Sequence, residues 1–440
     1  MTFLAKVGDF TFDPSWTYLQ YVDINTGGFQ PKAVIFMYIR STASGNELQA
    51  YDGNTYDFGI GVASERTIGR FTNISHGVDD YPDQDGFWKG QYNNRIAYIN
   101  TSGYASPDAQ IDFNIMTSSG VRLRVYDQAA FPYKISYLAL GGTSLVEAFS
   151  ATRLRIDVSG YFELAETGFK PDVLFEMSSD YSYQTSSSAV QDFAVGVADK
   201  DMNQGVAYHG YTDWGTPAPY HALGHGCSGE ISAGIWKDDY PGDGSYAAYW
   251  MDTLTEFTDN GFVMYHNPVP SGGTTYTPSY YNYLAMRGGL WKVGFIETRV
   301  DGEDIIVDIG FRPVALMFLS SNKPQSSYGA FAPDGSTSFG IATSETERRT
   351  IAVWNEYVES GFPLNVASAK YSDAVYVNLK NGELTEAMDI KSIDNTGFTV
   401  VMDTFSIPYG GNFVTYLAWG YEVIPEITTT GNDQPTVFMV

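Results

Sequence analysis

The stretch Gly28–Phe36, with the sequence GFQPKAVIF, returns as GFKPDVLF at Gly168–Phe175 and as GFRPVALMF at Gly310–Phe318. Successive copies begin 140 and 142 residues apart. Because proline cannot donate a hydrogen bond to a sheet, its position predicts the start of a strand or a sheet edge. The apolar run that follows is typical of a buried central strand. We therefore expect a chain of 440 residues to contain three tandem copies of one module.

Three further landmarks follow in the same order in every copy. They are an alternating strand pattern, a turn that leads into a strand, and a closing strand that begins with tyrosine. Their positions are 57–63, 192–198 and 338–343 for the first, 119–123, 260–264 and 396–400 for the second, and 137–142, 283–289 and 416–420 for the third. Alternation with a period of two marks strands, and Asn260-Gly261 suits a hairpin turn because both residue types tolerate a positive φ.

This pattern predicts an all-β fold built from three tandem β-sandwich modules with a jelly-roll-like arrangement. We expect the modules to span residues 1–143, 144–290 and 291–422, with long variable loops in the second, and residues 423–440 to form a C-terminal arm. A single cysteine, Cys227, rules out an intrachain disulfide. Each module is therefore expected to be stabilised by an apolar interior of its own.

Charge and composition argue against two classes of function, nucleic-acid binding and membrane insertion. The formal net charge is −26, and an acidic surface repels both phosphate backbones and anionic membranes. The chain also lacks a run of about 18 apolar residues, so we expect neither nucleic-acid binding nor membrane insertion. The segment from Met1 to Phe12 lacks the basic and then apolar pattern of a secretory signal, so we expect the protein to be made and folded without secretion by the usual route.

The four landmarks resemble a repeat of tailed-phage and prophage virion proteins. In that repeat a Gly-Phe-Gln-Pro segment, a Phe-x-Ile-Gly-x-Ala strand, a Gly-Phe turn and a Tyr-Leu-Ala-Leu-Gly-Gly strand follow one another. The resemblance covers nearly the whole chain, through about Tyr421. It implies a virion component on the surface of the tail or capsid, assembled in the host cytoplasm as a homo-oligomer in contact with other virion proteins. It carries over no catalytic residue, and the lack of heptads or a shaft repeat favours a globular subunit over a long fibre.

Aromatic residues gather where the copies differ most, in the polar, Gly- and Tyr-rich segments 79–94 and 199–229 and close to them. We expect these segments to be insertion loops, where binding surfaces usually lie. Aromatic faces stack on sugar rings and are enriched at protein interfaces. The residues expected to contact a ligand or a neighbouring subunit are Tyr81, Trp88, Tyr211, Trp214, Trp236 and Tyr240. The alternative is that some of these residues cap the module cores.

Histidines and the cysteine of the second copy suggest a zinc site. His221, His225 and Cys227, with His209 before them, offer the nitrogen and sulfur ligands that Zn²⁺ prefers. Two histidines four residues apart would share one side of a helix, but Gly224 and Gly226 argue against a helix. We therefore expect a loop, in which these groups either converge on a metal or are simply hydrogen-bonded and solvated.

Acidic pairs suggest a second kind of metal site. The sequence Asp-Asp-Tyr-Pro occurs twice, with Asp79 and Asp80 in one copy and Asp238 and Asp239 in the other. Carboxylates in loops bind Ca²⁺ through their oxygens, although the spacing of an EF-hand is absent. A solvated turn is the alternative, so the pattern requires no cofactor.

The sequence thus favours a non-catalytic structural subunit of the virion surface. A receptor-binding, lectin-like adhesin that contacts host glycans is the alternative. A polysaccharide-degrading enzyme is a third hypothesis, because 51 acidic residues offer many carboxylate pairs, but the sequence selects none of them.

Overall fold

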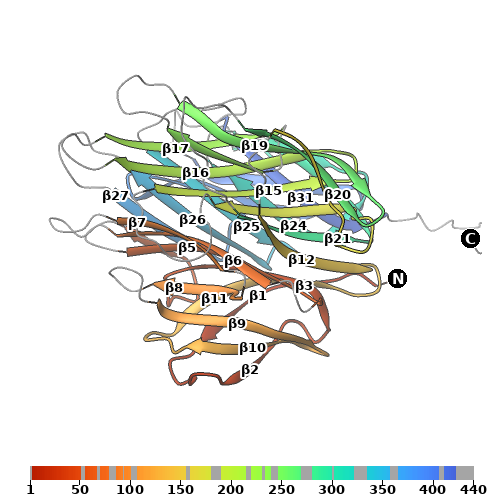
Figure 1. Ribbon diagram of the computed structural model, residues 1–440, viewed down its shortest axis with the longest axis horizontal. Coiled ribbons are helices and arrows are strands. Elements are labelled where there is room, and N and C mark those ends of the chain that lie inside the picture. The colour runs from red at the N-terminus through yellow and green to blue at the C-terminus, as the bar shows by residue number, and fades with distance from the viewer. Residues whose placement is uncertain are drawn as a thin grey trace, which may run out of the picture.

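The computed structural model describes residues 2–50, 55–66, 70–78, 86–92, 94–100, 107–154, 159–179, 190–214, 220–229, 233–238, 246–268, 280–299, 302–321, 334–356, 365–405 and 411–422. All regular elements in these ranges are β-strands, and they pair antiparallel in six sheets (Figure 1). The predicted all-β, sandwich-like class is therefore confirmed. No helix in the described ranges is long and apolar enough to cross a membrane.

The first third of the chain supplies two sheets, which we call the first module. Its strands are β1 (Leu4–Phe12), β2 (Tyr21–Asn25), β3 (Pro31–Ile39), β4 (Glu47–Ala50), β5 (Thr55–Ser64), β6 (Arg70–Val78), β7 (Gly86–Tyr92), β8 (Ala97–Asn100), β9 (Pro107–Thr117), β10 (Gly120–Asp127) and β11 (Tyr133–Gly141). The large sheet has the order β1-β11-β3-β5-β6-β7, and the small sheet has the order β2-β10-β9-β8.

The second and third modules have the same order of equivalent strands. The second contains β12 (Glu147–Leu154), β13 (Gly160–Leu164), β14 (Val173–Ser179), β15 (Val190–Asp199), β16 (Gln204–Trp214), β17 (Tyr220–Ser228), β18 (Ala233–Asp238), β19 (Tyr246–Thr258), β20 (Gly261–Pro268) and β21 (Tyr280–Arg287). The third contains β22 (Leu290–Glu297), β23 (Ile305–Asp308), β24 (Arg312–Ser320), β25 (Asp334–Ala342), β26 (Arg348–Glu356), β27 (Asn365–Tyr371), β28 (Tyr376–Lys380), β29 (Glu383–Ile393), β30 (Gly397–Phe405) and β31 (Phe413–Tyr421). Their large sheets run β12-β21-β14-β15-β16-β17 and β22-β31-β24-β25-β26-β27, and their small sheets β13-β20-β19-β18 and β23-β30-β29-β28. The division of the chain at residues 143 and 290 stays a prediction.

The strand that closes each copy of the pattern is buried on both faces. In β11, Leu138 and Leu140 belong to a cluster shared with the other modules, whereas Tyr137 and Ala139 belong to the interior between the two sheets of the first module. The same alternation occurs in β21 and β31. These strands are therefore apolar at nearly every position rather than at every second one.

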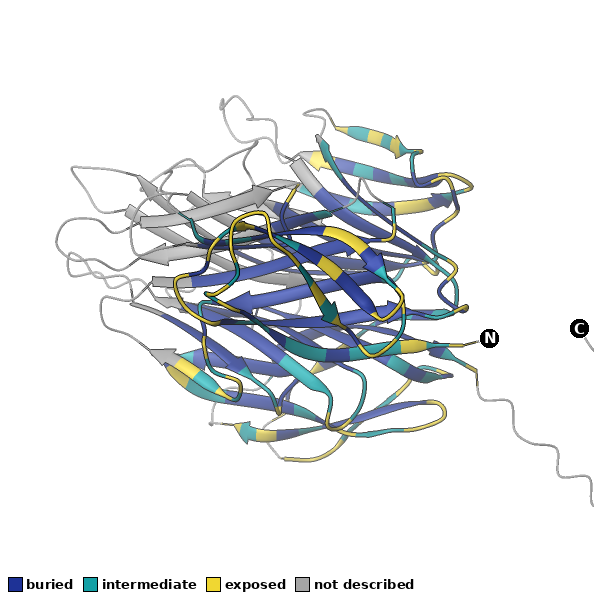
Figure 2. Cartoon of the chain, turned by 90° about the horizontal axis from the view of Figure 1, so that it is seen from below, coloured by how far each residue is buried: buried dark blue, intermediate teal, exposed yellow. Residues whose placement is uncertain are grey.

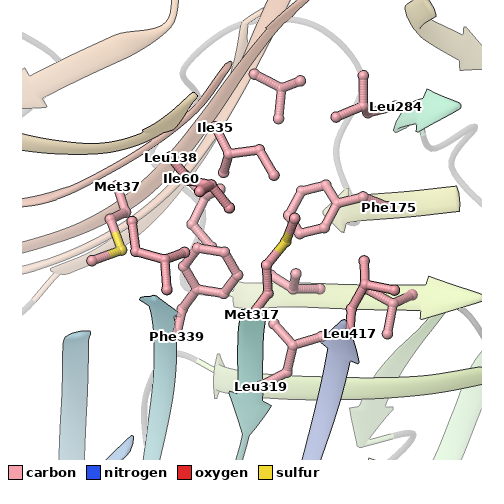
Figure 3. Close-up of a cluster of buried hydrophobic side chains, with 14 of the residues drawn as sticks. Ile35, Met37, Ile60, Leu138, Phe175, Leu284, Met317, Leu319, Phe339 and Leu417 are labelled. Carbon is pink, nitrogen blue, oxygen red and sulfur yellow. The ribbon is translucent and has the colours of Figure 1, made fainter. Parts of the chain in front are cut away.

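The large sheets of the three modules face one another around this shared cluster, which we call the central cluster. It includes Ile35 and Leu138 from the first module, Phe175 from the second, and Met317 and Leu417 from the third (Figure 3). Each module also has an interior of its own, as predicted. The central cluster was not predicted, because an unbroken apolar run shows that both faces of a strand are covered but not what covers them.

One strand from the first part of the chain extends the large sheet of the third module. β4 leaves the first module and pairs antiparallel with β27 at the edge of the third large sheet. Asn46, just before β4, donates to both carboxylate oxygens of Asp373 at 2.8 Å and accepts the backbone N–H of Ser372 at 2.8 Å. The pairing of β4 with β27 satisfies backbone groups that would otherwise be unpaired at this sheet edge.

Two recurring glycines are required for different physical reasons. The glycine that opens each copy of the first landmark is left-handed, with a φ of +78° at Gly28, +74° at Gly168 and +81° at Gly310, a conformation that side chains disfavour. The hairpin turn predicted at Asn260-Gly261 joins β19 and β20, but Gly261 has no positive φ. A Cβ there would lie 1.7 Å from a backbone carbonyl oxygen of the neighbouring β13, and the equivalent glycines of the other modules meet similar obstacles.

Replacing Leu138 by alanine is expected to destabilise the whole chain rather than one module, because this side chain is buried in the central cluster. A leucine-to-alanine change in a core costs about 2–5 kcal/mol. Differential scanning calorimetry should show a single transition that moves to lower temperature. Ile306→Ala, at a position that is 75% exposed, is the control and should leave the transition in place. Separate transitions, of which only one moves, would contradict a shared core.

Candidate functional site

The structure places several predicted ligand-contacting residues on strands rather than in loops. Segment 79–94 contains β7, and segment 199–229 contains β16 and β17. The strands carry Trp88 on β7, Tyr211 and Trp214 on β16, and Trp236 and Asp238 on β18. Outside the described residues lie Tyr81, Tyr240, Asp79, Asp80 and Asp239. The prediction of loops was wrong for these three strands, because glycine and tyrosine in polar surroundings also fit strands that approach a neighbouring backbone closely.

The predicted zinc ligands lie on paired strands. His209 on β16 pairs with His225 on β17, and Ala207 pairs with Cys227. The side chains of His221, His225 and Cys227 lie outside the described residues. The expectation of a loop for these residues was wrong, because they belong to β16 and β17. Among the side chains that the structure describes, no group of three or more potential metal ligands gathers.

An exposed group of tyrosines lies on the outer side of the small sheet of the first module. Tyr18 precedes β2, Tyr21 begins it, and Tyr126 lies on the neighbouring β10; we call these three residues the tyrosine patch. Tyr18 is 61% and Tyr21 is 53% exposed, and the rings of Tyr18 and Tyr126 meet edge to face at 6.0 Å. Buried and more exposed residues alternate along β10, so the strand itself holds Tyr126 outward. Bands of buried and exposed colour also alternate along strands at the surface of the molecule (Figure 2).

Arginines frame the tyrosine patch. The guanidinium of Arg95 lies over the ring of Tyr126, 3.2 Å from its centroid, and is held by a 2.8 Å hydrogen bond from its Nε to Gln110. The guanidinium of Arg124 lies 6.0 Å from the ring centroid of Tyr21, its cross-strand partner. The Nε of Arg124 is buried and has no hydrogen-bond partner in the described part of the chain. Aromatic rings beside guanidinium donors suit a sugar ring that carries a carboxylate.

The equivalent place in the second module carries another tyrosine pair. Tyr161 on β13 is 71% exposed and lies opposite Tyr265 on β20, with ring centroids 5.0 Å apart. Sequence reasoning missed both groups because it searched the variable segments. A signal was present in Tyr21–Asn25, where outward polar or aromatic residues alternate with apolar ones.

A buried ion cluster links the first and third modules. Asp9 on β1 accepts hydrogen bonds from Nε of Arg349 at 2.7 Å and from the hydroxyl of Ser136 at 2.5 Å, and Nζ of Lys370 lies 3.1 Å from it. Burial raises the pKa of Asp9, but the hydrogen bond from Arg349, the charge of Lys370 and the hydrogen bond from Ser136 outweigh burial and lower the pKa below its ordinary value. Burial lowers the pKa of Lys370, which is 1% exposed. This cluster holds the modules together rather than facing a ligand.

No family model matches the chain, and no curated protein matches it. The central cluster and the tyrosine patch are therefore the features from which a function can be inferred.

Asp9→Asn is expected to destabilise the protein by about 3–5 kcal/mol at neutral pH, because Lys370 would keep a buried charge without its carboxylate. Asp9 has a lowered pKa in the folded state, so its contribution to stability is complete above the unfolded pKa of about 4 and is lost as the pH falls through the folded pKa. The free energies of unfolding of wild type and variant in urea should therefore differ at neutral pH and converge in acid.

Asp23→Asn is the matched control, because it removes a carboxylate whose partner, Arg122, is exposed. This change should alter stability little at any pH. A difference between Asp9→Asn and wild type that stays constant from neutral pH to acid would contradict the role of the Asp9 charge.

Proposed function

We propose that this protein is a non-catalytic structural subunit on the surface of a tailed-phage particle, in the tail or on the capsid. The observation that carries the proposal is the central cluster, which joins three modules of equal strand order into one body. Because the inner faces of the large sheets are occupied in this cluster, the small sheets remain available for contacts with neighbouring subunits. The resemblance of the repeated landmarks to those of virion proteins supports the same function.

The proposed partners are other virion proteins and further copies of this chain. Three like modules present three similar outward sheets, which suits an assembly in which subunits repeat with symmetry. A net charge of −26 favours basic protein surfaces over nucleic acid as neighbours. Assembly would take place in the host cytoplasm, with residues 423–440 acting as an arm that docks on a neighbour through Phe438 and Met439.

Deleting residues 424–440 is expected to abolish incorporation into particles and to leave the thermal unfolding of the purified chain unchanged. Incorporation is measured by immunoblot of purified particles, normalised to the major capsid protein. Wild-type levels of the truncated chain in particles would show that the arm is dispensable. Particles made with the intact chain that contain none of it would overturn the proposed function itself.

Receptor binding is the second candidate, and the tyrosine patch favours it. Exposed rings stack on sugars, and the adjacent guanidinium of Arg124 offers a positive charge to an acidic group. A surface subunit that carried such a patch would contact a host glycan without changing it. The two candidates are compatible, because the patch lies on an outer sheet and not at the central cluster.

Changing both Tyr18 and Tyr21 to alanine is expected to weaken binding to an acidic glycan by about tenfold, since each ring contact contributes about 0.5–1.5 kcal/mol. A glycan array identifies the ligand, and titration calorimetry measures the change. Ile306→Ala removes an even more exposed apolar side chain from another module and should bind as wild type. Equal loss in both variants, or no array signal, would contradict receptor binding through this patch, and release of reducing sugar would favour a degrading enzyme.

A further inference from the structure

A leucine in a strained backbone conformation lies at the edge of the tyrosine patch. The backbone N–H of Gln20 donates to the carbonyl oxygen of Thr17 at 2.9 Å and closes a four-residue turn, in which Tyr18 and Leu19 are the central residues. Leu19 has a φ of +65°, although a turn with a positive φ at its third residue normally contains glycine or asparagine there. A bulky side chain in this left-handed conformation is an outlier that the surrounding structure must hold in place.

The equivalent residue of the third module is a glycine. Val22 on β2 and Ile305 on β23 pair with equivalent positions of the neighbouring strand, each three residues after the glycine that begins it. Leu19 and Gly302 each lie three residues before these positions, and Gly302 has a φ of +70°. The third module thus meets this backbone conformation with the residue best suited to it. The first module has a leucine there instead, and burial offsets little of the strain because the side chain is 39% exposed.

The turn is anchored on β10. The backbone N–H of Leu19 donates to the carbonyl oxygen of Val125 at 2.8 Å, and the N–H of Val125 donates to the carbonyl oxygen of Gln20 at 2.9 Å. These bonds extend the pairing of β2 with β10 beyond the start of β2. Leu19 is therefore held beside the segment of β10 that carries Arg124 and Tyr126, and an exposed apolar side chain is added to the tyrosine patch.

The side chains of this surface suit three different groups of a ligand. The rings of Tyr18 and Tyr126 stand at 75° to each other, so they form a corner for a small ring-shaped ligand rather than a flat surface for a protein. The guanidinium of Arg124, 6.0 Å from the ring centroid of Tyr21, attracts a carboxylate. Leu19 offers apolar contact alone. The hydroxyl groups of a plain sugar do not use such contact, whereas the methyl group of an acyl substituent does.

We propose that Leu19 determines the specificity of the tyrosine patch and that the patch binds an acidic sugar that carries an acyl group. The inference rests on the receptor-binding candidate and names its class of ligand. The carboxylate of the sugar lies near Arg124, its ring stacks on the tyrosines, and its acyl methyl group contacts Leu19. The strained conformation of Leu19 is retained because glycine at this position would remove that contact.

Leu19→Gly tests the strain without any ligand. Because glycine adopts a left-handed conformation freely, the variant should melt at a temperature no lower than that of wild type, although an apolar side chain is lost. Ile306→Gly is the matched control, because Ile306 is an exposed apolar residue without a positive φ, on β23. This control should melt below wild type, since glycine weakens a strand. A fall in melting temperature of Leu19→Gly equal to that of the control would show that Leu19 is not strained and would overturn the proposal.

A matched pair of ligands tests the specificity. Titration calorimetry of the full-length protein compares the methyl glycoside of glucuronic acid with that of its acetamido analogue. Wild type should bind the analogue about fourfold more tightly, the effect of burying roughly one methyl-sized group, and Leu19→Gly should bind the two ligands equally.

The outcomes separate this proposal from the function on which it rests. Equal binding of the two ligands by wild type would overturn the role of Leu19 and leave receptor binding in place. Binding of neither ligand, together with a silent glycan array, would overturn both. Loss of Leu19→Gly from purified particles, with the preference for the analogue unchanged, would assign Leu19 to a contact with a neighbouring protein and would also overturn the proposal.

Discussion

Burial of both faces of three large sheets is the constraint on which the rest of the structure depends. Strand β11 shows it most directly, because Leu138 and Leu140 pack in the central cluster while Tyr137 and Ala139 pack inside their own module. A sheet covered on both faces has no free surface for a ligand. Ligand contact is therefore left to the outer sheets, and polar chemistry is left to the contacts between modules. The tyrosine patch and the Asp9 cluster are found in these two places.

An apolar cluster alone does not fix how three sheets are set against one another, because the hydrophobic effect is not directional. Buried hydrogen bonds between modules are directional, and they restrict the relative orientation of the sheets. The hydroxyls of Ser64 and Ser150 hydrogen-bond at 3.0 Å and connect the first module to the second. The hydroxyl of Ser321 accepts from the backbone N–H of Tyr208 and donates to its carbonyl oxygen, both at 2.8 Å, and these bonds connect the third module to the second. Each of these groups would lose its buried partner if the sheets shifted by one residue, and an unpaired buried polar group is costly. Together with the Asp9 cluster, they specify one arrangement out of many that would bury a similar apolar area.

The sequence was sufficient to predict the strands that carry the landmarks, the all-β class and the apolar interior of each module. It was insufficient wherever the partner of a residue lies in another module. Short strand β4 has no pattern of its own, because its pairing with β27 depends on a sheet edge more than 300 residues away. The strand register also corrects the alignment of the third copy. Phe339 occupies the position of Ile60 in its sheet, and Thr337 occupies the position of Phe58. The tyrosine patch was missed for a related reason, because Tyr21 and Tyr126 belong to regular strands and the search was confined to segments that vary between copies.

Joining three modules in one chain allows equivalent positions to differ, which a trimer of identical chains does not. The closing strands place Leu140, Met286 and Trp419 at equivalent positions in the central cluster. The larger Trp419 is accommodated because a neighbouring residue is Gly289, where a Cβ would lie 2.3 Å from the indole nitrogen, and because its ring stacks on Trp291 at 5.6 Å.

The strand next to the alternating landmark shows the same freedom. Ser75, His209 and Val353 are equivalent by their pairing with Phe58, Phe193 and Thr337. A buried histidine in all three modules would place three polar rings around one apolar centre, at the desolvation cost of each. In a single chain only one module carries the histidine, so that cost arises once. Differences such as the single buried His209 of β16 are thus a consequence of the same covalent connection that makes the three modules share one core.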